Sequence, residues 1–177
     1  MAADCGHILP DVLAPGLAIV FCGSAAGRRS AQLGAYYAGP GNRFWATLHA
    51  TGLTPRLLRP AEFADVVRYG LGLTDLCKTQ SGADADLARG SDDVDGFRTK
   101  IERYRPAVVA FVGKRAAKAC LRRTTVAFGP QPDRIGRTAV FVLPSPSGAA
   151  RGFWDAHWWH ELAALEQDDI RLTQPDV

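Results

Sequence analysis

The sequence lacks the long apolar segments that membrane and secreted proteins need. A membrane-spanning helix requires about 20 consecutive apolar residues, and no run in this chain approaches that length. Residues 1–10 contain Asp4 and His7, and they lack the basic start and the apolar core of a signal peptide. We therefore expect a cytoplasmic protein that makes no contact with a membrane.

Spacings typical of metal sites are also missing. The 4 cysteines form no C-x-x-C pair, which argues against a structural zinc site and an iron–sulfur cluster. His157 and His160 have no apparent third ligand, and the segment around Asp84 and Asp86 lacks the glycine and glutamate of a calcium loop. We expect no bound metal.

The chain carries little net charge. Lys plus Arg number 21 and Asp plus Glu number 18, which permits an anionic partner without requiring one. With 177 residues, 47% hydrophobic and 22% charged, the composition is that of a globular protein. We expect a single domain over residues 1–177, with a frayed tail from about residue 168.

Strand and helix patterns alternate along the sequence. Continuous apolar runs with many β-branched residues are typical of strands buried on both faces, and they occupy residues 17–22, 107–112 and 139–143, with a shorter candidate at 71–76. Helical patterns lie between and after them, at residues 42–51, 61–69, 94–104, 114–123 and 153–167. The alternation predicts an α/β fold with a mostly parallel sheet of four to five strands and helices on both faces.

Ligands of open α/β sheets bind beyond the carboxyl ends of the strands. Four segments leave strand ends here, at residues 23–27, 74–76, 113–115 and 144–148, and we expect them to meet in one crevice. The first of these, GSAAG, matches neither the P-loop nor the dinucleotide-binding pattern. Taken alone, it could be an ordinary strand-to-helix turn.

Five short motifs in register point to a family. They are GSAAG at 23–27, PGNRFW at 40–45, GLT at 72–74, GK at 113–114 and LPSPSG at 143–148. From about residue 11 to residue 165 the chain resembles the mismatch-specific uracil/thymine DNA glycosylases of the uracil-DNA glycosylase superfamily. The resemblance implies a three-layer α/β/α fold and a monofunctional enzyme that needs no cofactor. Such an enzyme flips uracil out of DNA, since a stacked base hides its sugar carbon, and hydrolyses the N-glycosidic bond to leave an abasic site.

One departure from the family concerns the attacking water. The asparagine that positions this water in the family falls on Ala25, which offers no hydrogen bond. Asp75, at the end of a predicted strand, is our candidate for the missing group, because a carboxylate can orient water, accept its proton and offset a cationic sugar. Ser24 is a second candidate that can hold water but supplies no charge. Alternatively, Asp75 caps a turn or pairs with Lys78.

The resemblance also implies the residues that hold the base. Tyr37 falls on the aromatic residue that stacks on the flipped base, although it could instead pack a loop against the core. Backbone groups around Ser24 would read the uracil edge, and Asn42 would brace its loop from a helix start. Substrate-binding positions are therefore expected at Gly23, Ala25, Tyr37, Asn42 and Ser145.

The segment after the last predicted strand should meet the DNA. The family places a bulky wedge there to fill the vacated stack, whereas this chain has Ala149 and Ala150. A small wedge favours activity on single strands as well as duplexes. DNA contacts are expected from Lys114, Ser147, Gly148, Ala149 and Arg151, with further phosphate contacts possible from Arg28 and Arg29.

Two other functions stay open at this level. The excised base could be hypoxanthine or mismatched thymine, or the chain could be a non-catalytic DNA-binding relative that lost its chemistry with Ala25. In each case the expected partner is DNA, which for the leading hypothesis contains uracil. We expect a monomer, because a long polymer needs open access to the crevice.

Overall fold

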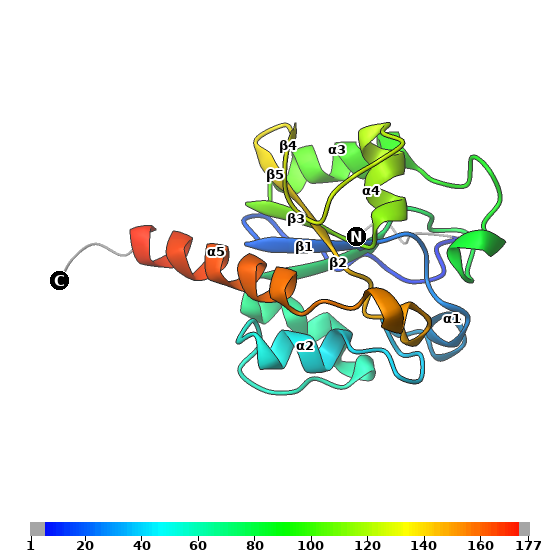
Figure 1. The fold of residues 1–177 in the computed structure, drawn as a ribbon, viewed down its shortest axis with the longest axis horizontal. Coiled ribbons are helices and arrows are strands. Elements are labelled where there is room, and N and C mark those ends of the chain that lie inside the picture. The colour runs from blue at the N-terminus through cyan, green and yellow to red at the C-terminus, as the bar shows by residue number, and fades with distance from the viewer. Residues whose placement is uncertain (1–5, 174–177) are drawn as a thin grey trace.

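A five-stranded sheet forms the centre of the molecule in the computed structural model, which describes residues 6–173 except for the side chains at 151, 153 and 167–173. The strand order is β2-β1-β3-β5-β4 (Figure 1). Only β4 runs antiparallel to its neighbour. The strands are β1 (Ile19–Gly23), β2 (Leu71–Asp75), β3 (Val108–Val112), β4 (Gly129–Ile135) and β5 (Thr138–Leu143). The predicted α/β class with a mostly parallel sheet is confirmed.

The strand order creates a switch point at β1. The chain leaves β1 to form β2 on one side and later returns to form β3 on the other side. Connections of this kind leave a crevice at the carboxyl ends of the strands. The parallel register of β1 and β2 pairs Ile19 with Leu71 and ends with Gly23 beside Asp75.

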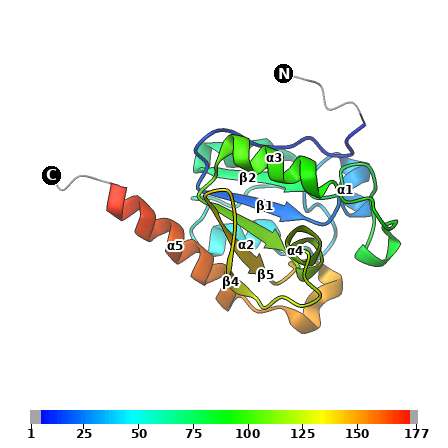
Figure 2. The same cartoon turned by 90° about the horizontal axis from the view of Figure 1, so that it is seen from above.

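Helices cover both faces of the sheet (Figures 1 and 2). On one face Phe21 packs against Phe44 of α2 (Phe44–Ala50) and Trp159 of α5 (His157–Thr173), with ring centroids 5.3 and 5.8 Å apart. On the other face Phe111 packs against Phe97 of α3 (Val94–Tyr104) at 5.7 Å, and α4 (Lys114–Leu121) lies beside it. The layers follow from the period of two along each strand, which sends alternate buried side chains to opposite faces.

Four short elements complete the chain. They are α1 (Arg28–Leu33) and the 3-10 segments η1 (Pro60–Tyr69), η2 (Asp84–Asp86) and η3 (Gly148–Phe153). The sequence predicted an α-helix in place of η1, and it did not predict α1 or η2. Each of these elements is short or 3-10 in geometry, so the 3.6-residue period that marks an α-helix is weak in them.

Strand β4 was also missed, and α5 is displaced along the sequence. β4 contains Pro130 and Pro132, and between its buried end residues it alternates exposed with half-buried residues, which an edge strand tolerates because one side needs no partner. Helix α5 runs to Thr173 rather than ending at residue 167. The predicted tail beyond Thr173 lies outside the described residues. Within residues 6–173, no helix has the length and apolar character needed to cross a membrane.

Candidate active site

A cleft of about 510 Å³ opens at the carboxyl ends of the parallel strands. Its walls include Gly23 at the end of β1, Asp75 at the end of β2, Gly113 after β3 and Ser145 after β5. The four strand-end segments therefore meet in one crevice, as the sequence predicted. The loop between α1 and α2 supplies a further wall, which contains Tyr37 and Asn42.

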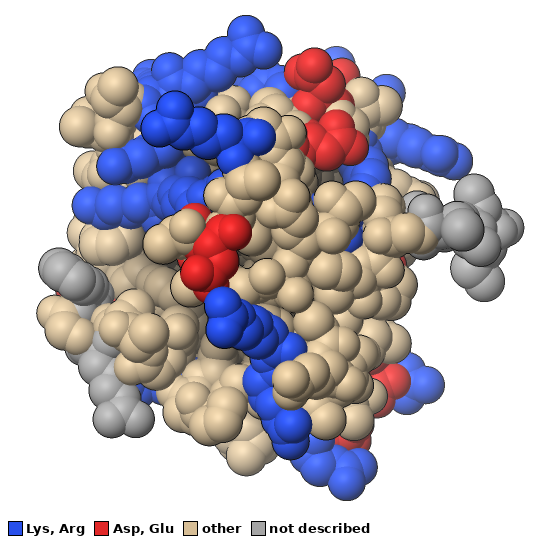
Figure 3. Space-filling model, turned by 90° about the vertical axis from the view of Figure 1, so that its right-hand side faces the viewer, with Lys and Arg blue, Asp and Glu red and all other residues tan. Residues whose placement is uncertain are grey.

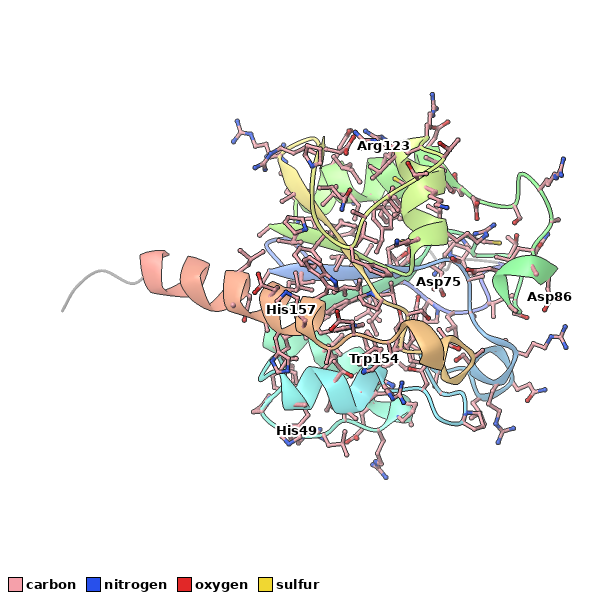
Figure 4. All side chains as sticks on the ribbon, in the orientation of Figure 1. His49, Asp75, Asp86, Arg123, Trp154 and His157 are labelled. Atoms are coloured by element: carbon pink, nitrogen blue, oxygen red, sulfur yellow. The ribbon has the colours of Figure 1, made fainter. Side chains whose placement is uncertain are left out.

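The backbone around Asp75 is fixed by β1. The peptide N–H of Leu76 donates to the carbonyl of Gly23 at 2.9 Å, and that of Cys77 donates to the carbonyl of Ser24 at 2.8 Å. The carboxyl group then lies against Gly23, because a Cβ added to Gly23 would come within 2.6 Å of Asp75 Oδ1. Glycine at position 23 is therefore what leaves room for this carboxylate. Figure 4 shows Asp75 at the end of the sheet, on the side of α1 and η3.

Asp75 is buried without a direct partner. The residue is 6% exposed, and among the described residues its side chain accepts no hydrogen bond and forms no ion pair. Burial raises the pKa of Asp75 to about 7, opposed by the positive charge of Lys78 and reinforced by the negative charge of Asp11. The group can therefore accept or release a proton near neutral pH.

The pairing of Asp75 with Lys78 that the sequence left open is not formed. Lys78 instead places Nζ 2.7 Å from Asp11 Oδ1 and donates to the Tyr36 hydroxyl at 3.2 Å. Asp11 was missed in the sequence, since it lies far from Asp75 along the chain and in no recognisable motif. It reaches this place because Val12 forms an antiparallel bridge with Leu73 of β2. A long-range bridge of this kind leaves no local sequence pattern.

Tyr37 stands beside the carboxylate. Its ring stacks on Phe44 with centroids 3.8 Å apart and an interplanar angle of 18°, so one ring face is covered by protein. The backbone is left-handed there, with φ 53°. Its hydroxyl is buried with no hydrogen-bond partner among the described residues, and burial raises the pKa of Tyr37 well above its usual value. The side chain is thus a rigid, neutral wall of the cleft.

Two loops of the cleft are tied together by backbone contacts. Asn42 Oδ1 accepts from the peptide N–H of Phe44 at 2.9 Å, which braces the start of α2. The peptide N–H of Arg43 donates to the carbonyl of Pro146 at 2.9 Å, and the Ser145 hydroxyl accepts from the peptide N–H of Ser147 at 3.3 Å. Asn42 and Ser145 therefore both line the cleft and shape its loops.

The predicted DNA contacts divide into two groups. Ser147 and Ala149 line the cleft, whereas Lys114 and Gly148 do not. The Lys114 ammonium lies 4.2 Å from the ring centroid of Phe128, and a Cβ on Gly148 would lie 3.2 Å from the carbonyl oxygen of Pro40. The side chain of Arg151 lies outside the described residues.

Charge of both signs surrounds the mouth of the cleft. Figure 3 shows the face at the right-hand side of Figure 1, where Lys and Arg side chains gather in two places with acidic side chains between them. Arg28, Arg29 and Asp84 are exposed and line the cleft. The Arg28 guanidinium pairs with Asp86 at 3.1 Å. No group of three or more His, Cys, Asp or Glu residues that could hold a metal occurs in the described part of the chain.

Comparisons with known proteins agree with this fold. A solved NMR structure from Methanosarcina acetivorans is similar to this chain with a TM-score of 0.63, over 90% of this chain and 95% of that one, at 22% identity. That protein carries only a provisional assignment as a uracil DNA glycosylase, and at this identity the likeness shows the fold alone. A model of the uracil DNA glycosylase superfamily matches residues 10–167, a range that contains every wall of the cleft except Leu9. The chain belongs to the uracil DNA glycosylase superfamily.

Proposed function

We propose that this chain is a monofunctional glycosylase that removes uracil from DNA and leaves an abasic site. Superfamily membership supports a DNA glycosylase, and the motifs resemble those of the mismatch-specific branch. The observation that carries the proposal is the Asp75 carboxyl group, buried in the cleft without a direct partner and with a pKa of about 7. A group with these properties is suited to general-base work at neutral pH.

The flipped base would lie against the free face of Tyr37. Phe44 covers the opposite face of that ring, so the tyrosine cannot swing away when a base binds. Stacking of a base on an aromatic ring is worth about 1–3 kcal/mol and does not depend on base identity. Discrimination between bases would then come from polar groups around Gly23 and Ser24. The small side chain of Ala25 would leave space for the base.

In the reaction, Asp75 would hold and deprotonate the attacking water. The water oxygen forms a bond to the sugar C1′ while the C1′–N bond breaks. The electron pair of the broken C1′–N bond leaves with the base. The proton passes to Asp75, which returns it to solvent or to the departing base. The negative carboxylate also stabilises the cationic, oxocarbenium-like sugar of the transition state. Ser24 would assist by holding the same water through its hydroxyl.

DNA would be bound around the cleft by the segment after β5. Ser147, Gly148, Ala149 and Arg151 would contact the strand, and Lys114 would approach a phosphate. The methyl groups of Ala149 and Ala150 fill little of the gap left by a flipped base. We therefore propose activity on both single- and double-stranded DNA, by a monomer.

A wider base range is the second candidate. Ala25, Ala149 and Ala150 all line the cleft with methyl groups, which leaves room for a base other than uracil. Hypoxanthine and mismatched thymine are the bases to test. Neither changes the role proposed for Asp75, because the sugar chemistry is the same.

The decisive experiment is an excision assay on end-labelled oligonucleotides. Single strands and duplexes containing uracil, hypoxanthine or mismatched thymine are incubated with enzyme, and abasic sites are revealed by alkaline strand cleavage. We expect excision of uracil from both substrates and its loss in Asp75→Ala, which should still bind DNA. Binding without excision of any base would show a non-catalytic DNA-binding protein.

A further inference from the structure

A buried lysine, Lys78, follows Asp75 by three residues and forms no ion pair with it. Lys78 is 5% exposed, and its ammonium contacts Asp11 Oδ1 at 2.7 Å and the Tyr36 hydroxyl at 3.2 Å. Lysine is rarely buried to this extent, because removing an ammonium from water is costly unless it is paired. Its retention inside the protein therefore calls for an explanation beyond packing.

Asp11 is shared between two cations. Its Oδ1 accepts from the Thr74 hydroxyl at 2.7 Å in addition to Lys78, and its Oδ2 lies 2.6 Å from Lys100 Nζ. These contacts lower the pKa of Asp11 against the opposing effect of burial, so it is ionised at neutral pH. Two ammonium groups share one carboxylate, which leaves one positive charge that Asp11 does not neutralise.

Asp75 follows Thr74 directly in the sequence, and its carboxylate has no hydrogen-bond or ion-pair partner among the described residues. Thr74 links Asp11 to Asp75. Its hydroxyl donates to Asp11, and Asp75, the next residue along the chain, lines the cleft. Lys78 lowers the pKa of Asp75 and Asp11 raises it. The network and Asp75 are therefore coupled through charge, with no direct hydrogen bond between them.

Among the described residues that line the cleft or interact electrostatically with Asp75, the other groups do not supply this charge. Burial raises the pKa values of Cys22 on β1 and of Tyr36 and Tyr37 in the loop after α1, so all three are neutral near pH 7. The remaining charged side chains of the cleft are at its exposed rim, where water screens them: Arg28, Arg29 and Asp84.

We propose that Lys78, held in place by Asp11 and Tyr36, is a positioning residue that sets the charge of the Asp75 carboxyl group. Its consequence for catalysis rests on the proposed role of Asp75 as the base. Lys78 favours the ionised carboxylate and Asp11 moderates that effect. Together they hold Asp75 within the neutral range, where it can both activate water and release the proton.

Variants of the two residues should act in opposite directions. Lys78→Met removes the positive charge, so the pH midpoint of Asp75 ionisation should rise by about one pH unit. Asp11→Asn removes the opposing negative charge, so the midpoint should fall. Lys78→Arg keeps the charge and should stay near wild type. Lys100→Met is the matched control, because Lys100 contacts the same carboxylate but is not among the groups that shift Asp75.

Two readouts separate this inference from the proposed function. The carbon-13 NMR shift of the Asp75 carboxyl group gives its midpoint directly, and single-turnover excision from uracil DNA gives the midpoint of the reaction. Opposite shifts of the NMR midpoint in Lys78→Met and Asp11→Asn, with a smaller shift in Lys100→Met, would support the inference. If the excision midpoint then fails to follow, the base role of Asp75 is wrong but its coupling to Lys78 stands.

An NMR midpoint that stays at the wild-type value in both variants would overturn the inference, even if both variants lose activity. That result would mean that Lys78 and Asp11 act only as structural supports. If Lys78→Met does not fold, the direction of the shift in Asp11→Asn decides the matter, and a midpoint unchanged or raised there contradicts the inference.

Discussion

Replacing Asp75 by asparagine should make the protein more stable while it slows excision by orders of magnitude. The carboxyl group has a pKa of about 7 in the folded protein and an ordinary value of 3.8. The folded protein therefore holds a proton that the unfolded chain has already lost between about pH 4 and pH 7. Across that window the free energy of unfolding falls as pH rises, because ionised Asp75 is disfavoured in the cleft. Asparagine has nearly the same shape and no charge to bury.

The magnitude follows from the same two pKa values. Their difference corresponds to about 4 kcal/mol at pH 8, and water entering the open cleft reduces it, so we expect a gain of about 2–4 kcal/mol. For a chain of 177 residues this is a rise in Tm of roughly 5–15 °C. At pH 4 wild type and variant should be almost equally stable, since Asp75 is then protonated in the folded protein.

Urea unfolding of the two proteins at several pH values measures this effect. Every other carboxylate titrates in both proteins, so the difference between their free energies of unfolding isolates position 75. The difference should be near zero at pH 4, grow through pH 7 and level off above it. A difference that does not change with pH, or that favours wild type at pH 8, would refute the assignment of a strained, ionisable carboxyl group to this cleft.

Three further predictions concern the walls of the cleft. Gly23→Ala should lower the rate of uracil excision at least 100-fold, because the added Cβ would lie 2.6 Å from Asp75 Oδ1. Gly152→Ala is the control: its Cβ meets open space, so this variant should excise uracil at the wild-type rate in the same assay. Tyr37→Ala should weaken productive binding of uracil DNA about 5- to 150-fold in single-turnover titrations, because the base loses its stacking partner. Tyr37→Phe should match wild type, because the hydroxyl has no partner among the described residues. Equal binding defects in the two variants would contradict the proposed stacking of the base on the Tyr37 ring. Ala149→Leu should raise the rate on duplex relative to single-stranded DNA, and an unchanged ratio would contradict the small-wedge argument.

The parts of the structure that follow from local pattern could be predicted from the sequence. The runs that became β1, β3 and β5 are continuous and apolar because both faces of each strand are buried, and such runs are easy to recognise. Strand β4 escaped prediction because its prolines and charged residues leave no continuous apolar run. Only its position at the sheet edge, a property of the assembled fold, makes that composition acceptable.

The same distinction applies to the cleft. Asp75 could be proposed because it ends a recognisable strand, and the ends of parallel strands gather at one edge. Lys114 also follows a strand, yet its ammonium lies over Phe128 instead of lining the cleft. Asp11 could not be anticipated, since its contacts with Lys78 and Lys100 exist only once the N-terminal segment pairs with β2. Side-chain direction and long-range ion pairs are set by the tertiary fold.

The central claim is that the ionised Asp75 carboxylate activates water for cleavage of the glycosidic bond. Single-turnover excision of uracil from a single-stranded oligonucleotide, measured from pH 5 to pH 9, tests it most directly. For wild type the rate should rise about tenfold per pH unit below pH 7 and level off above it, in line with the pKa of about 7. Asp75→Asn should be slower by about 100- to 10,000-fold at pH 8 and should lack this rise. An Asp75→Asn enzyme with the wild-type rate and pH profile would contradict the claim.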